Sequence, residues 1–140
     1  MPNTLEIVKT AMTAYNDKDW EKLKEVFAPD AVYDEKGTHR RLQGIGPVVE
    51  AWRGWAVAFP DSRGTFVREF TSGETAVLEV VWKGIHSGPL QMPSGTIPAS
   101  SKTIELPACQ IVEVKGDKIT SFTHYFDMLT LLTQIGAAEA

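Results

Sequence analysis

The residues at 124–127 read HYFD and are the stretch best suited to acid/base chemistry. His124 can act as a general base near neutral pH, since an unperturbed imidazole titrates at about 6.5. Asp127 could orient that imidazole, but residues three apart on a strand point to opposite faces, so a dyad requires a bend. Asp127 also directly precedes the apolar segment MLTLLTQIG, and its carboxylate can instead cap a helix there. We prefer one pocket residue and one cap over a catalytic pair, and keep both residues as catalytic candidates.

Each of three predicted strands carries one polar side chain on its apolar face: His86 in 76–86, Gln110 in 104–114, and His124 in the last strand. A single buried polar residue is most simply a satisfied core residue. Three of them on successive strands favour a small-molecule pocket with a mainly apolar wall. If His124 removes a proton next to a carbonyl group, Gln110 and His86 could donate hydrogen bonds to the enolate oxygen.

The hairpin around the KGD tripeptide decides whether Gln110 and His124 share a face of the sheet. A two-residue turn at 116–117 pairs Gln110 with Thr123 and places His124 opposite Cys109, on the other face. A three-residue loop or a bulge places Gln110 and His124 on the same face. The sequence leaves both registers open.

Aromatic residues add to the candidate pocket. Trp55 lies on the apolar stripe of a predicted helix, and Tyr15 lies on the apolar face of another. Trp82 and Phe122 share the strand faces that carry the polar residues. Core packing is the preferred explanation of the Trp55 stripe and explains Tyr15 at least as well as a functional role does. The alternative is that Tyr15, Trp55, Trp82 and Phe122 contact a bound substrate.

These residues need a scaffold, and the hydrophobic periodicity predicts one. The chain falls into three predicted helices, then four long strands, and a final helix. The expected ranges are helices at 4–16, 19–27 and 47–59, a short strand at 31–35, strands at 64–71, 75–84, 102–114 and 118–127, and a last helix at 128–136. This order predicts an α+β fold, a curved antiparallel sheet with helices on one face. The long segment 87–101 is typical of a functional loop.

Composition narrows the class of protein. A chain of 140 residues fits one domain, 1–140. The net charge of −4 argues against nucleic acid or an anionic membrane surface as partner. Cys109 is the single cysteine and no run of 18 apolar residues exists, so we expect a cytoplasmic protein. The three histidines lack metal-ligand spacing, so we expect neither a metal nor a cofactor.

Five segments resemble the SnoaL-like polyketide cyclases of the nuclear-transport-factor-2-like superfamily: FAPDAVY, GPVVEAWRGWAVAFPD, WKGIHSGPL, GDKITSFTHYFD and LLTQIG. The resemblance covers nearly the whole chain. It implies a cone-shaped, cystatin-like α+β barrel in which a strongly bent sheet and helices enclose a deep pocket. It also implies a homodimer and a cofactor-free aldol ring closure.

The resemblance also bears on individual residues. It places His124 where the cyclases carry their catalytic aspartate, Gln110 where they carry a pocket histidine, and His86 on a histidine of a similar strand-end motif. Acid/base chemistry on a small apolar carbonyl compound is therefore the first hypothesis. The alternatives are a non-catalytic module that binds a small hydrophobic ligand, and a dimeric interaction domain.

Overall fold

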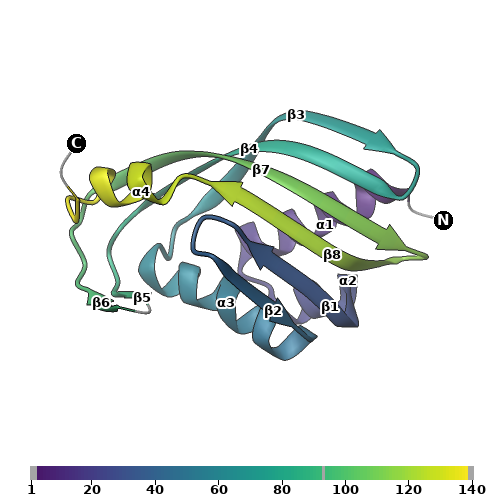
Figure 1. The fold of residues 1–140 in the computed structure, drawn as a ribbon, viewed down its shortest axis with the longest axis horizontal. Coiled ribbons are helices and arrows are strands. Elements are labelled where there is room, and N and C mark those ends of the chain that lie inside the picture. Colours follow the sequence, from purple (N-terminus) through teal and green to yellow (C-terminus); the bar gives the residue numbers. More distant parts are fainter. Residues whose placement is uncertain (1–2, 93, 139–140) are drawn as a thin grey trace.

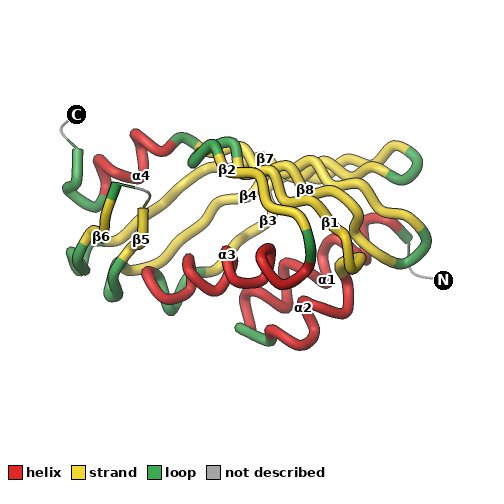
Figure 2. The backbone as a smooth tube through the Cα atoms, turned by 60° about the horizontal axis from the view of Figure 1, so that its bottom comes forward, coloured by secondary structure: helices red, strands yellow, loops and turns green. Residues whose placement is uncertain are grey.

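The computed structural model describes residues 3–92 and 94–138, which form one large sheet with helices packed against its concave face (Figures 1 and 2). In chain order the elements are α1 (Thr4–Asp17), α2 (Trp20–Val26), β1 (Phe27–Glu35), β2 (Arg40–Gln43), α3 (Ile45–Ala58), β3 (Arg63–Ser72), β4 (Thr75–Ile85), β5 (Leu90–Met92), β6 (Gly95–Ile97), β7 (Thr103–Lys115), β8 (Lys118–Phe126) and α4 (Met128–Gln134). The predicted α+β class is confirmed.

The helices begin where the sequence provides caps. The Asn3 side chain accepts a hydrogen bond from the Glu6 backbone while the Glu6 side chain accepts one from the Asn3 backbone, a capping box that starts α1. Asp19 caps α2 in the same position. The third helix begins at Ile45, two residues before the predicted start, because Gly44 turns the chain with a φ of 95°.

The six long strands are ordered β2-β1-β8-β7-β4-β3, and all neighbours are antiparallel except β1 and β8. The prediction of a purely antiparallel sheet is therefore wrong for this pair. A parallel pair needs a long crossover, and here residues 36–117 lie between the two strands. β1 also begins at Phe27 rather than at 31, and β5 and β6 form a small hairpin inside the segment predicted as a loop.

A β-bulge settles the register of the last hairpin. The turn is the two-residue Gly116–Asp117, but the pairing shifts between Glu113 and Val114, so that Thr120 is an extra residue on β8. Beyond this bulge Gln110 pairs directly with His124. Both side chains therefore lie on the face that the helices cover.

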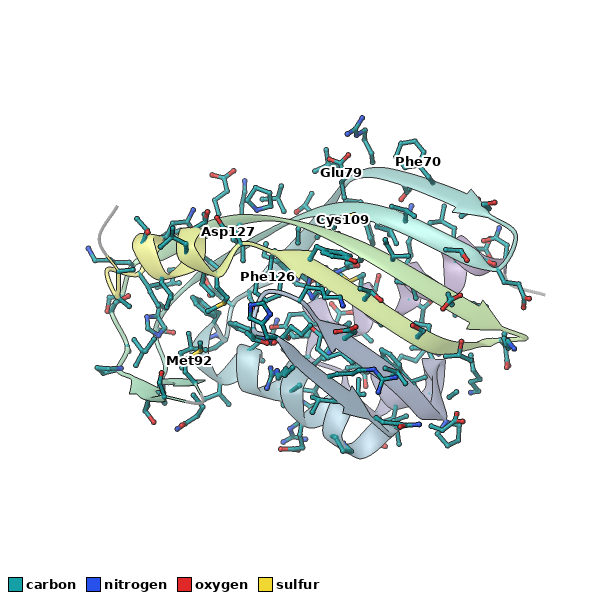
Figure 3. All side chains as sticks on the ribbon, in the orientation of Figure 1. Phe70, Glu79, Met92, Cys109, Phe126 and Asp127 are labelled. Carbon is teal, nitrogen blue, oxygen red and sulfur yellow. The ribbon has the colours of Figure 1, made fainter. Side chains whose placement is uncertain are left out.

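Apolar side chains between the helices and the sheet form two buried clusters. The larger cluster joins α1, α2 and α3 to the sheet, and a smaller one joins the end of α3, α4 and the β5–β6 hairpin to β7. The opposite face of the sheet has no helix over it, and Figure 3 shows Phe70 and Glu79 pointing outward there. No helix within the described ranges is long and apolar enough to cross a membrane.

Candidate active site

A pocket lies where the two buried clusters meet. Its empty volume is about 530 Å³, including the part open to solvent. Most of its wall is aromatic or aliphatic, as is usual for small-molecule sites. The lining residues are Tyr15, Tyr33, Trp52, Trp55, Phe59, Ser62, Trp82, Ile104, Leu106, His124, Phe126 and Leu131.

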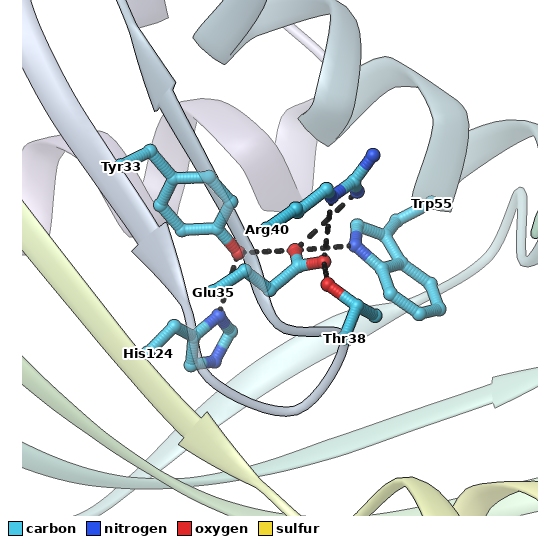
Figure 4. Close-up of polar contacts among 6 residues, drawn as sticks. All are labelled: Tyr33, Glu35, Thr38, Arg40, Trp55 and His124. Atoms are coloured by element: carbon cyan, nitrogen blue, oxygen red, sulfur yellow. Dashed lines mark hydrogen bonds and ion pairs between the residues drawn. The ribbon is translucent and has the colours of Figure 1, made fainter. Parts of the chain in front are cut away.

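His124 is the one imidazole in this wall, and it is only 7% exposed. Its Nδ1 lies 2.9 Å from the Tyr33 hydroxyl, which in turn donates to Glu35 Oε2 at 2.6 Å (Figure 4). Because Tyr33 gives its single proton to Glu35, it must accept from His124, so we assign the proton to Nδ1. The Nε2 atom of His124 is then the unprotonated nitrogen.

Two weak contacts reach this Nε2 atom. Trp82 donates its indole N–H to it at 3.3 Å, and the Gln110 amide nitrogen lies 3.5 Å away. Both distances are long for N–H donors, which prefer about 2.9–3.0 Å. The lone pair of Nε2, which could accept a proton, therefore makes only weak hydrogen bonds. It lies beside the indole of Trp82, which also lines the pocket.

The Glu35 carboxylate is fully buried and anchors this chain of groups (Figure 4). It accepts hydrogen bonds from Arg40 Nε at 2.8 Å, Trp55 Nε1 at 2.9 Å and Thr38 Oγ1 at 2.5 Å, besides Tyr33. β1, the following turn, β2 and α3 each supply one of these partners. A buried carboxylate is tolerated when it is paired and hydrogen-bonded in this way.

The pKa values follow from this arrangement. Burial alone would raise the pKa of the Glu35 carboxyl, but the charge and hydrogen bond of Arg40, with those of Thr38 and Tyr33, hold it below its usual value. Burial raises the pKa of Tyr33 well above 10, and the Glu35 charge adds to this effect. Burial lowers the pKa of His124 to about 4, against a smaller opposing effect of Glu35. At pH 7 the three groups are an anion, a neutral phenol and a neutral imidazole.

The structure brings four of the predicted site residues, Tyr15, Trp55, Trp82 and His124, into the pocket wall. Asp127 does not join them. Its carboxylate accepts from the Leu129 backbone at 3.1 Å and from the Thr130 hydroxyl at 2.7 Å, which caps α4. This geometry agrees with the preferred interpretation of HYFD as one pocket residue and one cap. Asp127 lies just beyond the end of β8 and makes no hydrogen bond with His124.

Three other predicted residues lie outside the pocket wall. Gln110 lies beside His124 in the sheet, and Phe122 packs edge-on against Trp52 in the larger cluster. His86 follows the end of β4, where its Nδ1 accepts from the Ser100 backbone at 3.2 Å. There it is bonded to the segment 87–101, and none of these three residues is among those that line the pocket.

The sequence patterns did not identify Tyr33, Glu35 and Arg40 as site residues. Tyr33 and Glu35 alternate with Ala31 on one face of the AVYDE strand, so a charged residue on an apolar face could have revealed Glu35. Arg40 and Thr38 lie in a turn and a short strand that carry no such signal. Within residues 3–92 and 94–138, no group of three or more His, Cys, Asp or Glu residues is placed to hold a metal ion.

The fold and this site point to one class of protein, and comparison with known families agrees. The profile of the SnoaL-like polyketide cyclases matches residues 6–135, so the chain belongs to that family. No curated protein matches the sequence.

Solved structures share the fold at low sequence identity. A proposed SnoaL-like polyketide cyclase from Jannaschia sp. CCS1 has a TM-score of 0.86 and 16% identity, covering 96% of this chain and 92% of that one. IdmH, a proposed polyketide cyclase from Streptomyces antibioticus, has a TM-score of 0.82 and 22% identity, over 96% and 99%. TsrD from Streptomyces laurentii has a TM-score of 0.81 and 23% identity, over 96% and 95%.

Proposed function

We propose that this protein is a cofactor-free acid/base enzyme that removes a proton next to the carbonyl group of a small apolar compound, as in an aldol cyclisation or an isomerisation. The observation that carries the proposal is the chain from Glu35 through Tyr33 to His124, which ends at the wall of an apolar pocket. Membership of the SnoaL-like family supports the same reaction class.

In this mechanism Nε2 of His124 accepts the substrate proton and the imidazole becomes a cation. Tyr33 continues to accept from Nδ1–H, and the negative charge of Glu35 stabilises the cation, as its pKa-raising effect on His124 indicates. Nε2–H then returns a proton to the enolate or to the new alkoxide, and in D₂O solvent deuterium can replace this proton before it is returned. No outside oxidant or co-reactant is needed.

Protonation of Nε2 also breaks its hydrogen bond with the indole N–H of Trp82. Once Nε2 carries a proton it can no longer accept from the Trp82 indole N–H, so this donor becomes free at the moment when the enolate oxygen gains charge. An oxyanion donor of this kind is worth about 10²- to 10³-fold in rate. Gln110 has a buried Oε1 without a hydrogen-bond partner among the described residues, and a turn of its amide would let this oxygen accept the new Nε2–H. Gln110 would thus be a positioning residue.

One observation favours a second candidate function, non-catalytic binding of an apolar ligand. In the resting state both nitrogens of His124 already have hydrogen-bond partners, and the rest of the wall is mainly apolar. A binding module of this kind would gain stability from its ligand without turning it over.

Deuterium exchange separates the two functions without knowledge of the natural substrate. 1-Tetralone is a small apolar ketone whose C2 protons exchange slowly in D₂O, and NMR follows their loss. We expect the protein to accelerate this exchange and His124→Gln to reduce the acceleration by about 10²- to 10⁴-fold, the usual contribution of a positioned base. Asp127→Asn is the matched control and should retain it. Saturable binding of 1-tetralone without accelerated exchange would reject the enzyme and favour the binding module.

A further inference from the structure

A pair of hydroxyl groups also lines this pocket and has no part in the mechanism above. Tyr15, from α1, and Ser62, which precedes β3, are 3% and 4% exposed, and their oxygens lie 2.7 Å apart. Both residues belong to the pocket wall. Few polar groups face this mainly apolar cavity, so a paired hydroxyl site within it calls for an explanation beyond core packing.

The hydrogen-bond count of this pair leaves one donor unused. Each hydroxyl carries a single proton, and a hydrogen bond between the two consumes only one of them. Neither oxygen has another partner within the described residues. Whichever hydroxyl donates inside the pair, the O–H of the other remains available beside the cavity. A buried donor without an acceptor is unfavourable, so a ligand oxygen that accepts from it gains affinity.

Backbone contacts hold Ser62 firmly in this position. The Ser62 N–H donates to the Phe59 carbonyl at 3.0 Å, and Lys18 Nζ donates to the Ser62 carbonyl at 2.5 Å. Gly84 packs so closely against Ser62 that a Cβ added there would lie 3.1 Å from the Ser62 Cα. The hydroxyl is therefore placed before any ligand arrives, which lowers the entropic cost of binding.

The hydroxyl pair and His124 both lie close to one indole ring. The ring centroid of Trp82 is 5.3 Å from that of Tyr15 and 6.0 Å from that of His124. A ligand that packs against Trp82 is therefore near both polar groups.

The lack of a cationic side chain in the pocket wall favours an uncharged ligand group at this hydroxyl pair. The pocket wall contains no Lys or Arg. The Lys18 ammonium group lies 4.3 Å from the centroid of the Tyr15 ring and donates to the Ser62 carbonyl, but Lys18 is not among the residues that line the pocket. Burial raises the pKa of Tyr15 to about 12, against the smaller effect of its bond to Ser62, so the phenol keeps its proton. An uncharged oxygen acceptor fits this site better than a carboxylate.

We infer that Tyr15 and Ser62 form a second binding subsite that donates one hydrogen bond to an uncharged oxygen of the substrate, an ether or a second carbonyl. The substrate class is then a neutral compound that carries a second oxygen function besides the reacting carbonyl group. The inference rests on the proposed function only for placing the reacting carbonyl group at His124.

The test compares 1-tetralone with its 5-, 6- and 7-methoxy derivatives, which add one ether oxygen at different positions, by isothermal titration calorimetry. We expect at least one methoxy isomer to bind the protein about 5- to 10-fold more tightly than 1-tetralone. The double variant Tyr15→Phe/Ser62→Ala should lose this preference, measured as the ratio of the Kd values of 1-tetralone and the preferred methoxy isomer within the same variant. Each single variant keeps one hydroxyl donor and should lose less. Tyr125→Phe, on the outer face of the sheet, is the matched control and should keep the full preference.

The inference is overturned if no isomer is preferred by the unmodified protein, if none of the four ketones binds, or if the double variant keeps the preference. Deuterium exchange of 1-tetralone distinguishes this failure from failure of the proposed function, because 1-tetralone lacks the ether oxygen. Exchange by the unmodified protein, together with a methoxy preference that the double variant loses, supports both ideas. A preference without any exchange supports the subsite and rejects the enzyme.

Discussion

The chemistry of His124 depends on the residues behind it. An exposed histidine would be partly protonated near neutral pH and so partly unable to accept a proton. Burial keeps His124 neutral, while Tyr33 and Glu35 fix its tautomer and lie ready to stabilise its cation. A weaker but fully deprotonated base in a dry pocket suits a substrate whose proton is made acidic by a neighbouring carbonyl group.

The lowered pKa of His124 also makes stability depend on pH. Between pH 6.5 and about 4 the unfolded chain binds more protons than the folded protein, so the free energy of unfolding falls as the pH is lowered. The loss attributable to His124 is about 2 kcal/mol between pH 7 and pH 5. His86, whose pKa burial also lowers, acts in the same direction. Urea unfolding at pH 7, 6 and 5 should show a smaller loss for His124→Gln than for the unmodified protein. An unchanged slope would contradict the buried, neutral state of His124.

Arg40 supplies the charge that keeps Glu35 ionised. Its side chain is 41% exposed while that of Glu35 is fully buried, so solvent screens part of the pair. Arg40→Ala leaves a buried carboxylate without its cation, and we expect a loss of about 2 kcal/mol in the free energy of unfolding by urea. Arg41→Ala, an exposed neighbour on the same strand, should cost less than about 0.5 kcal/mol. Equal losses for the two variants would show that the Glu35 network is not structurally important.

At the level of elements, the sequence predicted the scaffold better than the sheet pairing. Helix caps and the alternation of apolar residues are local signals, and they located three helices, four long strands and the α4 cap. The bulge at Thr120 is also local in origin, since Ile119 and Phe122 are both fully buried but three residues apart, which breaks a strict alternation. The spacing of Ile119 and Phe122 in the sequence therefore favours the hairpin register with the bulge, which is the one observed.

Other parts of the site could not be predicted because they depend on contacts between distant segments. Glu35 matters through its bond to Trp55, which is 20 residues away on α3, and Tyr33 matters through His124 on another strand. His86 followed the same parity as the pocket residues, but its strand ends there and the chain folds back, so its side chain joins Ser100 instead. Parity predicts a face of a strand and does not predict which residues along it reach the cavity.

The cap of α4 offers a direct test of the two roles proposed for Asp127. Asp127→Ala removes the acceptor of the Leu129 N–H and of the Thr130 hydroxyl. We expect a loss of about 1 kcal/mol in the free energy of unfolding, typical of a lost N-cap. Urea unfolding measures this loss, and the deuterium exchange of 1-tetralone should stay within a few-fold of the original rate. A loss of exchange comparable with that of His124→Gln would instead make Asp127 a catalytic residue.

At the level of the whole molecule, the uncovered face of the sheet is where we expect the homodimer that the family resemblance predicts. Phe70 pairs with Val77, which pairs with Ile111, so apolar side chains form a row across three strands. Phe70 is 55% exposed, and Tyr125 on β8 is 44% exposed. Exposed apolar groups in this arrangement are typical of an interaction surface.

Sedimentation velocity tests this expectation. The unmodified chain should sediment as a dimer, and Ile111→Lys should shift it toward the monomer, because dimerisation would bury a charge in this apolar row. Val57→Lys places the same charge on an exposed position of α3 and should leave the dimer intact. A monomeric unmodified protein would remove the dimer from consideration, and a dimer unaffected by Ile111→Lys would move the interface elsewhere.

The parallel pairing of β1 with β8 has a consequence for how the protein folds. Tyr33 and His124 are 91 residues apart in the sequence, yet they touch across this one strand pair. Contacts between such distant segments form slowly, because a long loop must close before they contribute any stability. During synthesis α1, α2, α3 and the β3–β4 hairpin can form before His124 has been added to the chain. The base, its tyrosine and its carboxylate therefore come together only in a finished chain, and recovery of exchange activity should follow the slowest phase of refolding.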